Sequence, residues 1–92
     1  MKTYKIKKHN EAGDFKQGTL KSTVEEINKV LGFKSNIKDD PYKVKYSWGF
    51  TANGVKCAIW DYKGSHEYNQ FSFFGPQEIF IGLFGSTNVA EL

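Results

Sequence analysis

The sequence predicts an α+β fold: a small antiparallel sheet, built from an N-terminal strand or hairpin and a three-strand meander, packed against two helices. Apolar residues recur at helical spacing in two segments, which end near Leu31 and Phe84. Polar and apolar residues alternate over Tyr42–Phe50, and Asn53–Gly54 is a preferred two-residue hairpin turn. Since no repeat, low-complexity tract or linker interrupts the 92 residues, positions 1–92 are expected to form a single domain.

The first predicted element is a short strand over Lys2–His9, where Tyr4 and Ile6 alternate with lysines. Lysines on an edge strand discourage pairing with another chain, although the same residues could form an arm that binds phosphates. Residues Asp14–Leu20 are expected to be a second strand or an extended approach to the first helix.

The first helix has recognisable ends. Ser22 is the expected N-cap, because Glu25 follows it at the spacing of a capping box. Gly32 follows the last apolar residue of the stripe, Leu31, and is expected to end the helix in a left-handed conformation.

The meander is expected to contain strands over Tyr42–Phe50, Val55–Tyr62 and Asn69–Phe74, with a turn at Lys63–Glu67 between the last two. If the Asn53–Gly54 pair forms the two-residue turn, the register places Trp48 opposite Ile59 and Phe50 opposite Cys57. A one-residue shift would move every side chain to the other face.

The second helix is expected to start with Pro76 at its first position and to end near Gly85. Between them, apolar residues form a broad stripe that would face the sheet. The residues after Gly85 are expected to be a short polar tail.

The predicted register divides the side chains of the meander between two faces. The apolar face that should contact the helices contains Tyr42, Val44, Trp48, Phe50, Val55, Cys57 and Ile59, joined by Phe71 and Phe73. The opposite face and the adjoining turn supply the candidate binding residues, which are Lys43, Lys45, Ser47, Trp60, Tyr62, Lys63, His66, Ser72 and Phe74. Gly49 and Ala58 would leave a shallow depression near the middle of this face.

Exposed aromatic rings rimmed by lysines are typical of recognition surfaces. A planar ligand could stack on Trp60 or Tyr62 while lysines such as Lys43, Lys45 and Lys63 hold its phosphates. The same face could instead be an interface between identical subunits. A third alternative is that the second helix or the N-terminal strands cover part of it.

The type of basic residue argues against a sequence-specific DNA-binding protein, but the positive charge does not identify another partner. The formal net charge is +3, and all 13 basic residues are lysines. Arginine is the usual reader of guanine edges, so sequence-specific DNA recognition is not expected, whereas non-specific attraction to phosphates is compatible with lysine. An AT-rich genome would produce the same lysine bias without any functional meaning.

Catalytic and metal-binding patterns are weak. His9 and His66 do not stand at a metal-ligand spacing, and the single Cys57 excludes an internal disulfide and is expected to point into the core. No cofactor or metal is therefore expected, and the chain is interpreted as a non-enzyme. A small enzyme that uses Cys57 or His66 is the lesser alternative.

Four segments occur in an order that resembles a family of small, largely uncharacterised bacteriophage proteins. They are T-L-x-x-T-x-x-E-I-x-x-V-L-G-F (19–33), K-V-K-Y-S-W-G-F (43–50), A-I-W-D-Y-K (58–63) and F-S-F-F-G (71–75). Members of that family have a helix ending near L-F-G, a strand with a central tryptophan, an I-Y-D-Y-K-like strand and an aromatic segment ending in two glycines. This chain departs at the last segment, where Phe74–Gly75 stands in place of the double glycine.

The resemblance implies a phage-encoded binding protein that acts in counter-defence. It would either sequester a small nucleotide-like anionic ligand or block a host defence protein, and it is expected to form a homo-oligomer. With no recognisable signal peptide or transmembrane segment, it is expected to be soluble in the host cytoplasm and to have no membrane partner. A nonspecific nucleic-acid-binding protein is the main alternative.

Overall fold

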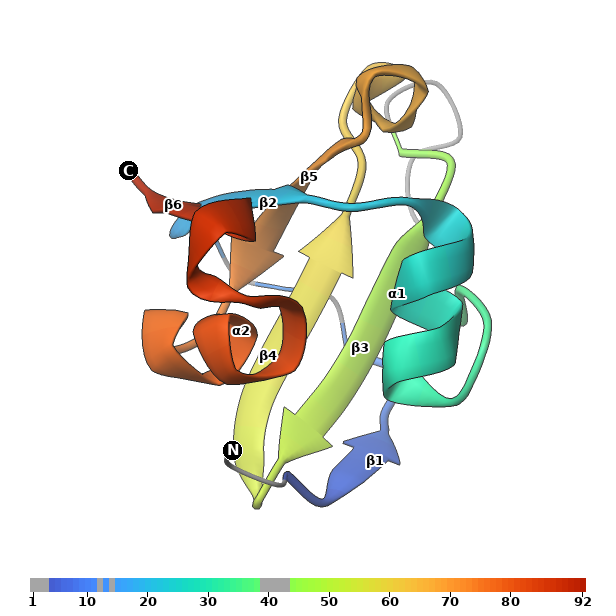
Figure 1. Cartoon of the computed structure of the whole chain (residues 1–92). Helices are drawn as coiled ribbons and strands as arrows, with labels where there is room; N and C mark the ends of the chain where they lie inside the picture. Colours follow the sequence, from blue (N-terminus) through green and yellow to red (C-terminus); the bar gives the residue numbers. More distant parts are fainter. Residues whose placement is uncertain (1–3, 12, 14, 39–43) are drawn as a thin grey trace.

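The computed structural model describes residues 4–11, 13, 15–38 and 44–92, and it has the predicted α+β fold. One six-stranded antiparallel sheet in the order β1-β3-β4-β5-β2-β6 carries both helices on the same face (Figure 1). Its elements are β1 (Ile6–Lys8), β2 (Gly18–Lys21), α1 (Val24–Leu31), β3 (Ser47–Ala52), β4 (Val55–Trp60), the 3-10 turn η1 (Ser65–Tyr68), β5 (Gln70–Phe74), α2 (Gln77–Phe84), the 3-10 turn η2 (Ser86–Asn88) and β6 (Val89–Glu91).

The β3–β4 hairpin has the predicted register. Trp48 pairs with Ile59 and Phe50 pairs with Cys57, with Asn53 and Gly54 at positive φ values of 51° and 83° in the turn. The register is correct because a two-residue turn of this kind fixes the pairing locally, before any distant contact is made.

The two N-terminal strands do not form a hairpin with each other. β1 pairs with β3 at one edge of the sheet, while β2 lies between β5 and β6 near the other edge. The predicted Lys2–His9 strand is confined to Ile6–Lys8, and residues 1–3 lie outside the described residues. The second strand begins later than predicted, at Gly18.

The prediction of a polar tail after Gly85 is wrong. The chain turns through η2 and returns as β6, which pairs with β2 and places Val89 beside the buried Leu20. Three residues are too few for an alternating pattern to be visible in the sequence.

Both helix starts differ from the predictions by one residue. Thr23, not Ser22, caps α1, because its side-chain oxygen accepts a hydrogen bond from the Glu26 amide at 3.1 Å. The Ser22 amide instead donates to the Asn69 carbonyl at 2.9 Å, which anchors Ser22 to the end of β5. Pro76 is the N-cap of α2 with an extended ψ of 130°, so the helix begins at Gln77. Gly32 ends α1 in the left-handed conformation, as predicted.

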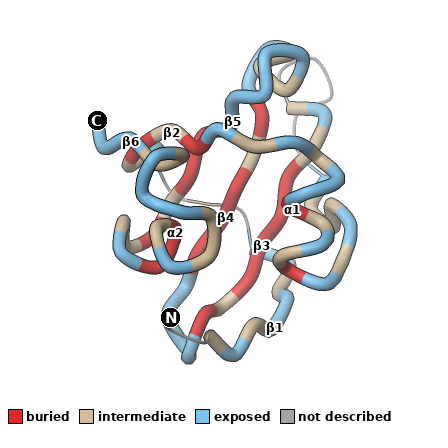
Figure 2. Tube along the Cα trace, in the orientation of Figure 1, coloured by how far each residue is buried: buried red, intermediate tan, exposed pale blue. Residues whose placement is uncertain are grey.

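The core lies between the helices and the sheet, as the buried stretches of the central strands show in Figure 2. The Phe73 and Phe80 rings stack with their centroids 4.2 Å apart, which joins β5 to α2. The Trp48 indole donates to the Asn28 side-chain oxygen at 3.0 Å, which joins β3 to α1. One predicted core residue, Val55, is 42% exposed because it stands at the hairpin end. No helix among the described residues is long and apolar enough to cross a membrane.

The predicted Tyr42–Phe50 strand begins only at Ser47. Tyr42 and Lys43 lie outside the described residues, and Val44 is half-buried. The amides of Lys45 and Tyr46 donate to a side chain, the Asp61 carboxylate, instead of to a neighbouring strand. This contact fixes the chain just before β3 and leads to the candidate site.

Candidate functional site

The middle of the sheet face opposite the helices is covered by a segment that follows β1, whose described residues there are 9–11, Gly13 and Phe15 (Figure 1). Gly13 packs so tightly here that a Cβ atom on it would lie 2.8 Å from the Trp60 ring and 2.9 Å from the Phe74 Cβ atom. The Phe15 ring packs edge-on against the Phe74 ring, with centroids 5.4 Å apart. Of the three alternatives for this face, cover by the N-terminal part of the chain is the one found. The cover comes from the residues after the strand, and α2 lies on the other face.

The depression expected at Gly49 and Ala58 is filled by backbone and by the Ile37 side chain, whose Cδ1 atom would lie 2.5 Å from a Cβ atom on Gly49. A Cβ atom on Gly49 would lie 2.7 Å from the Glu11 carbonyl oxygen and 2.8 Å from the His9 carbonyl oxygen. The Asn36 side chain holds the same layer in place, since it donates to the His9 carbonyl and accepts from the Gly49 amide. The expected concave binding surface is therefore occupied by the chain itself.

Four predicted site residues are consequently not available as an open surface. Ser47 and Ser72 are buried, at 2% and 6% exposure, and both lie opposite Trp60 in neighbouring strands. Trp60 and Phe74 are half-buried beneath the covering segment. Of the remaining candidates, Lys43 lies outside the described residues.

The other four predicted residues gather at one end of the sheet. We define the tip as residues 61–68, which connect β4 to β5, together with Lys45 and Tyr46, which precede β3. Tyr62 is 45% exposed, and Lys45 and Lys63 are also exposed, whereas His66 is half-buried. The tip projects beyond the strands at the end away from the β3–β4 hairpin (Figure 1).

Tyr68 and Asp61 also belong to the tip but were not among the predicted site residues. The Tyr68 side chain is 77% exposed, but its position in a polar turn gave no periodic signal. Asp61 is fully buried, and a signal for it was present: it comes directly after β4 and continues the alternation of Cys57 and Ile59, which places it on the inward face. A carboxylate at an inward-facing position indicates a buried polar network.

Asp61 connects three parts of the tip. Its Oδ1 atom accepts hydrogen bonds from the amides of Lys45 at 2.8 Å and Tyr46 at 2.7 Å. Its Oδ2 atom lies 2.6 Å from Nδ1 of His66, whose side chain is 17% exposed. These contacts satisfy a carboxylate that would otherwise be costly to bury, and they fix the ring of His66.

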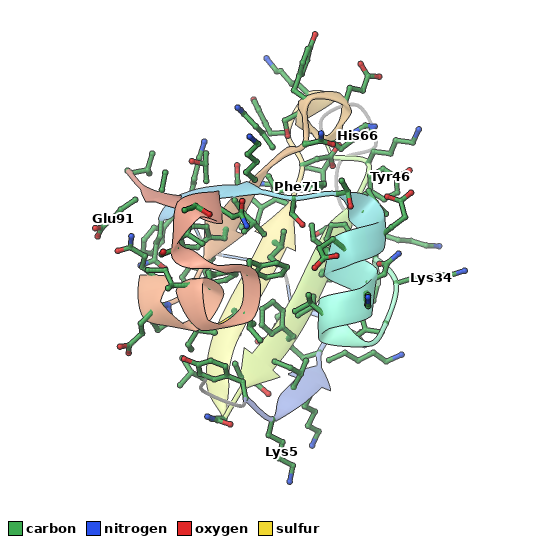
Figure 3. All side chains as sticks on the ribbon, viewed as in Figure 1. Lys5, Lys34, Tyr46, His66, Phe71 and Glu91 are labelled. Atoms are coloured by element: carbon green, nitrogen blue, oxygen red, sulfur yellow. The ribbon has the colours of Figure 1, made fainter. Side chains whose placement is uncertain are left out.

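Further contacts stiffen this turn. The Tyr46 ring packs edge-on against the His66 ring at 5.0 Å, and the two labelled side chains lie close together at the base of the tip in Figure 3. The Ser65 hydroxyl accepts from the Tyr62 amide at 3.1 Å. Lys63, with a φ of 51°, adopts a left-handed backbone that a side chain rarely takes up without such support. The exposed side chains of the tip are thus displayed from a well-braced backbone.

The Cys57–His66 pair considered for catalysis does not form. Cys57 is fully buried in β4 beside Gly75, and its thiol contacts the Val55 carbonyl at 3.6 Å. Burial raises the pKa of the Cys57 thiol to about 12, which disfavours the reactive thiolate. Within the described residues, no group of three His, Cys, Asp or Glu side chains could hold a metal ion.

Two cavities adjoin β2 and lie apart from the predicted site. The larger one, about 360 Å³, is lined by Lys21, Ser22, Thr23, Glu26, Asn69, Phe84 and Asn88. The smaller one, about 190 Å³, lies between β2, β5 and the C-terminal elements and shares Lys21 and Asn88 with it. None of the residues predicted to bind a ligand lines either cavity.

Comparison with protein-family models, with curated proteins and with solved structures found no match. The assignment of function therefore depends on the geometry of the tip and on the sequence resemblance given above.

Proposed function

We propose that this chain is a non-enzymatic binding protein that presents its tip to a protein partner. The observation that carries the proposal is the pair of exposed tyrosines, Tyr62 and Tyr68, on a turn braced by the buried Asp61. Tyrosine is among the residues that contribute most to binding energy in protein interfaces. A turn that is already rigid loses little conformational entropy when it binds.

The two exposed lysines of the tip, Lys45 and Lys63, outnumber its one exposed carboxylate, Glu67, and favour a partner with acidic groups at its rim. The ammonium groups of Lys45 and Lys63 lie 5.8 Å and 5.4 Å from the ring centroids of Tyr46 and Tyr62, so cationic and aromatic groups are presented together. Charges at the rim of an interface mainly raise the association rate and select the partner. A projecting turn suits insertion into a partner's cleft better than enclosure of a small molecule.

The resemblance to small bacteriophage proteins supports a host defence protein as this partner and the host cytoplasm as the place of action. The chain would then be a counter-defence inhibitor that blocks its target stoichiometrically, as a homo-oligomer. A nucleotide-like anion is the alternative ligand. In that case Tyr62 would stack on the base and Lys45 and Lys63 would hold the phosphate, since Trp60 is half-buried.

The test compares partner capture by the wild type with capture by tip and control variants. Tagged protein would be used to capture proteins from host cells, and a double variant with Tyr62→Ala and Tyr68→Ala would be compared with Val55→Thr. Val55 is similarly exposed but stands at the opposite end of β4. The expected result is one protein retained by the wild type and by Val55→Thr but lost from the double variant. Equal retention by all three folded proteins would exclude the tip as the binding surface.

Native mass spectrometry of the captured material tests the remaining alternatives together. A protein in fixed ratio to this chain supports the proposal, and a retained nucleotide supports the anionic ligand. The same spectrum reports the number of subunits and so tests the expected homo-oligomer.

A second candidate, nonspecific nucleic-acid binding, is favoured by the exposed Tyr68 ring, which belongs to the same tip as Lys45 and Lys63. Base–aromatic stacking contributes about 1–3 kcal/mol per base, so two tyrosines could hold a single strand. This function requires affinity for single-stranded oligonucleotides to fall steeply as salt rises. Binding that is insensitive to salt would exclude it.

A further inference from the structure

The outer edge of β1 is an open strand edge with a pronounced basic character. β1 stands at the end of the sheet order, and among the residues that the structure describes it pairs only with β3. The register places Lys7 opposite Thr51, and the ladder continues on both sides: the Asn53 amide donates to the Lys5 carbonyl and the His9 amide donates to the Gly49 carbonyl, each at 3.0 Å.

The alternation of antiparallel hydrogen bonds then determines which groups are free. Because Lys5, Lys7 and His9 direct their backbone groups toward β3, Ile6 and Lys8 direct theirs away from the sheet. Within the described residues, these outward amides and carbonyls have no backbone partner. They form a short template to which another extended chain could add.

The side chains around this template are cationic. Lys5, Lys7 and Lys8 are exposed, and Lys5 extends away from the sheet in Figure 3. The ion pairs of the described residues are formed by Lys56 with Glu11 and by His66 with Asp61, so the lysines of β1 have no acidic partner there.

The lysines of β1 indicate which kind of strand could pair with its outer edge. A second copy pairing through β1 would bring lysines opposite lysines, and like charges directly opposite each other destabilise a strand pair. An acidic strand would instead place carboxylates beside Lys5 and Lys7. Ile6 packs against the core on the other face of β1, so an apolar side chain is expected beside it.

We propose that the outer edge of β1 binds an extended segment of a partner protein in which acidic and apolar residues alternate, and that this segment adds to the sheet as a further strand. The acidic residues would lie beside Lys5 and Lys7, and the apolar residue would lie beside Ile6. This surface is at the other end of the molecule from the tip, so it is independent of the function proposed above (Figure 1).

The first arm of the test uses a fluorescein-labelled peptide of alternating glutamate and valine, with fluorescence anisotropy as the readout. Lys7→Glu is expected to weaken binding about tenfold or more, because it places like charges opposite each other. Lys21→Glu, which makes the same change of charge in β2, is expected to leave the affinity unchanged. Absence of binding to the wild type, or equal loss in both variants, would overturn the proposal.

The second arm separates strand addition from simple charge attraction. Two forms of the peptide would be N-methylated, one on the valines and one on the glutamates. Since every pairing in this sheet is antiparallel, the valine beside Ile6 should carry the backbone hydrogen bonds, so methylated valines should abolish binding and methylated glutamates should not.

Because the methylated peptides are tested on the wild-type protein, no variant has to fold for this arm to be decisive. Equal binding of both methylated peptides would contradict strand addition. If an oligothymidylate then bound with the same dependence on Lys7, the edge would be a nonspecific polyanion surface instead.

Discussion

At the scale of single residues, Asp61 determines whether the tip has a defined shape. One buried carboxylate accepts from two consecutive amides before β3 and contacts His66 in η1, so it joins two segments that are far apart in the sequence. The charge is tolerated because each oxygen has close donors. Any change at this position therefore alters the backbone that displays Tyr62 and Tyr68.

Asp61→Ala is expected to lower the free energy of unfolding by about 2–4 kcal/mol, because it leaves the partly buried amides of Lys45 and Tyr46 and the His66 ring without their acceptor. Asp61→Asn retains one oxygen for the two amides and should cost less. Urea denaturation measures both, with Glu67→Ala as a control because that carboxylate is exposed in the same turn. If Asp61→Ala were as stable as the control, the network would not be what braces the tip.

Cys57 gives a prediction about pH. Burial raises the pKa of its thiol in the folded protein from 9.0 to about 12, so the unfolded chain loses its proton first as pH rises. Stability from this group is fully present below about pH 9 and is lost between pH 9 and 12, at about 1.4 kcal/mol per pH unit. The difference in unfolding free energy between wild type and Cys57→Ala should shrink over this range, and a constant difference would contradict it.

At the scale of elements, the covering segment after β1 determines which side chains of the sheet are accessible to a ligand or partner. It lies over Trp60 and Phe74 and so converts a predicted recognition face into a second packed layer. The sequence does not reveal this, because the segment has no periodic pattern and, apart from the Phe15 ring, the contacts described here are made by Gly13 and by backbone carbonyls. The hairpin register was predictable, since it depends on Asn53 and Gly54 alone.

Gly49→Ala tests whether this layer is closely packed. The added methyl group would meet the end of the Ile37 side chain and two backbone carbonyl oxygens. The side chain can shift but the carbonyl oxygens cannot move as easily, so a loss of about 2 kcal/mol or more in unfolding free energy is expected. Thr51→Ala, on the same face two residues later, should change stability by less than about 1 kcal/mol. Thermal or urea denaturation of both variants gives the comparison, and equal stabilities would show that the layer is loose.

At the scale of the whole molecule, β2 holds the two ends of the sequence together. It pairs with β5 through Leu20 and Phe71 and with β6 through Leu20 and Val89, so residues more than fifty positions apart meet at one buried leucine. The sequence predicted a sheet and two helices, but it did not predict that β2 lies between β5 and β6. Strand order depends on contacts between distant residues, for which local patterns in Gly18–Lys21 contain no information.

Leu20→Ala should therefore destabilise the entire fold, by about 2–5 kcal/mol for removal of a fully buried leucine side chain. Tryptophan fluorescence and far-ultraviolet circular dichroism should report the same urea midpoint, because β2 connects the core to both neighbouring strands. Thr19→Ala, on the other face of β2, is the control. Separate midpoints would indicate that the sheet unfolds in parts.

The candidate site was predictable only in part, because part of it also depends on contacts between residues that are distant in the sequence. Lys45 and Tyr62 were identified from the hairpin register and Lys63 and His66 from the adjoining turn, and local sequence is sufficient for both. The burial of Ser47 and Ser72 depends on how residues far away in the chain cross the sheet.

The placement of β2 also has a consequence for synthesis on the ribosome. Both neighbours of β2 come from residues 70–91, so the strand has no hydrogen-bonding partner until most of the chain has been made. At about 5–20 residues per second, roughly 4–14 s separate the synthesis of Lys21 from that of Glu91. During this interval the nascent chain keeps Leu20 and the unpaired edges of β2 open to chaperones, and the fold closes only after translation has passed β6.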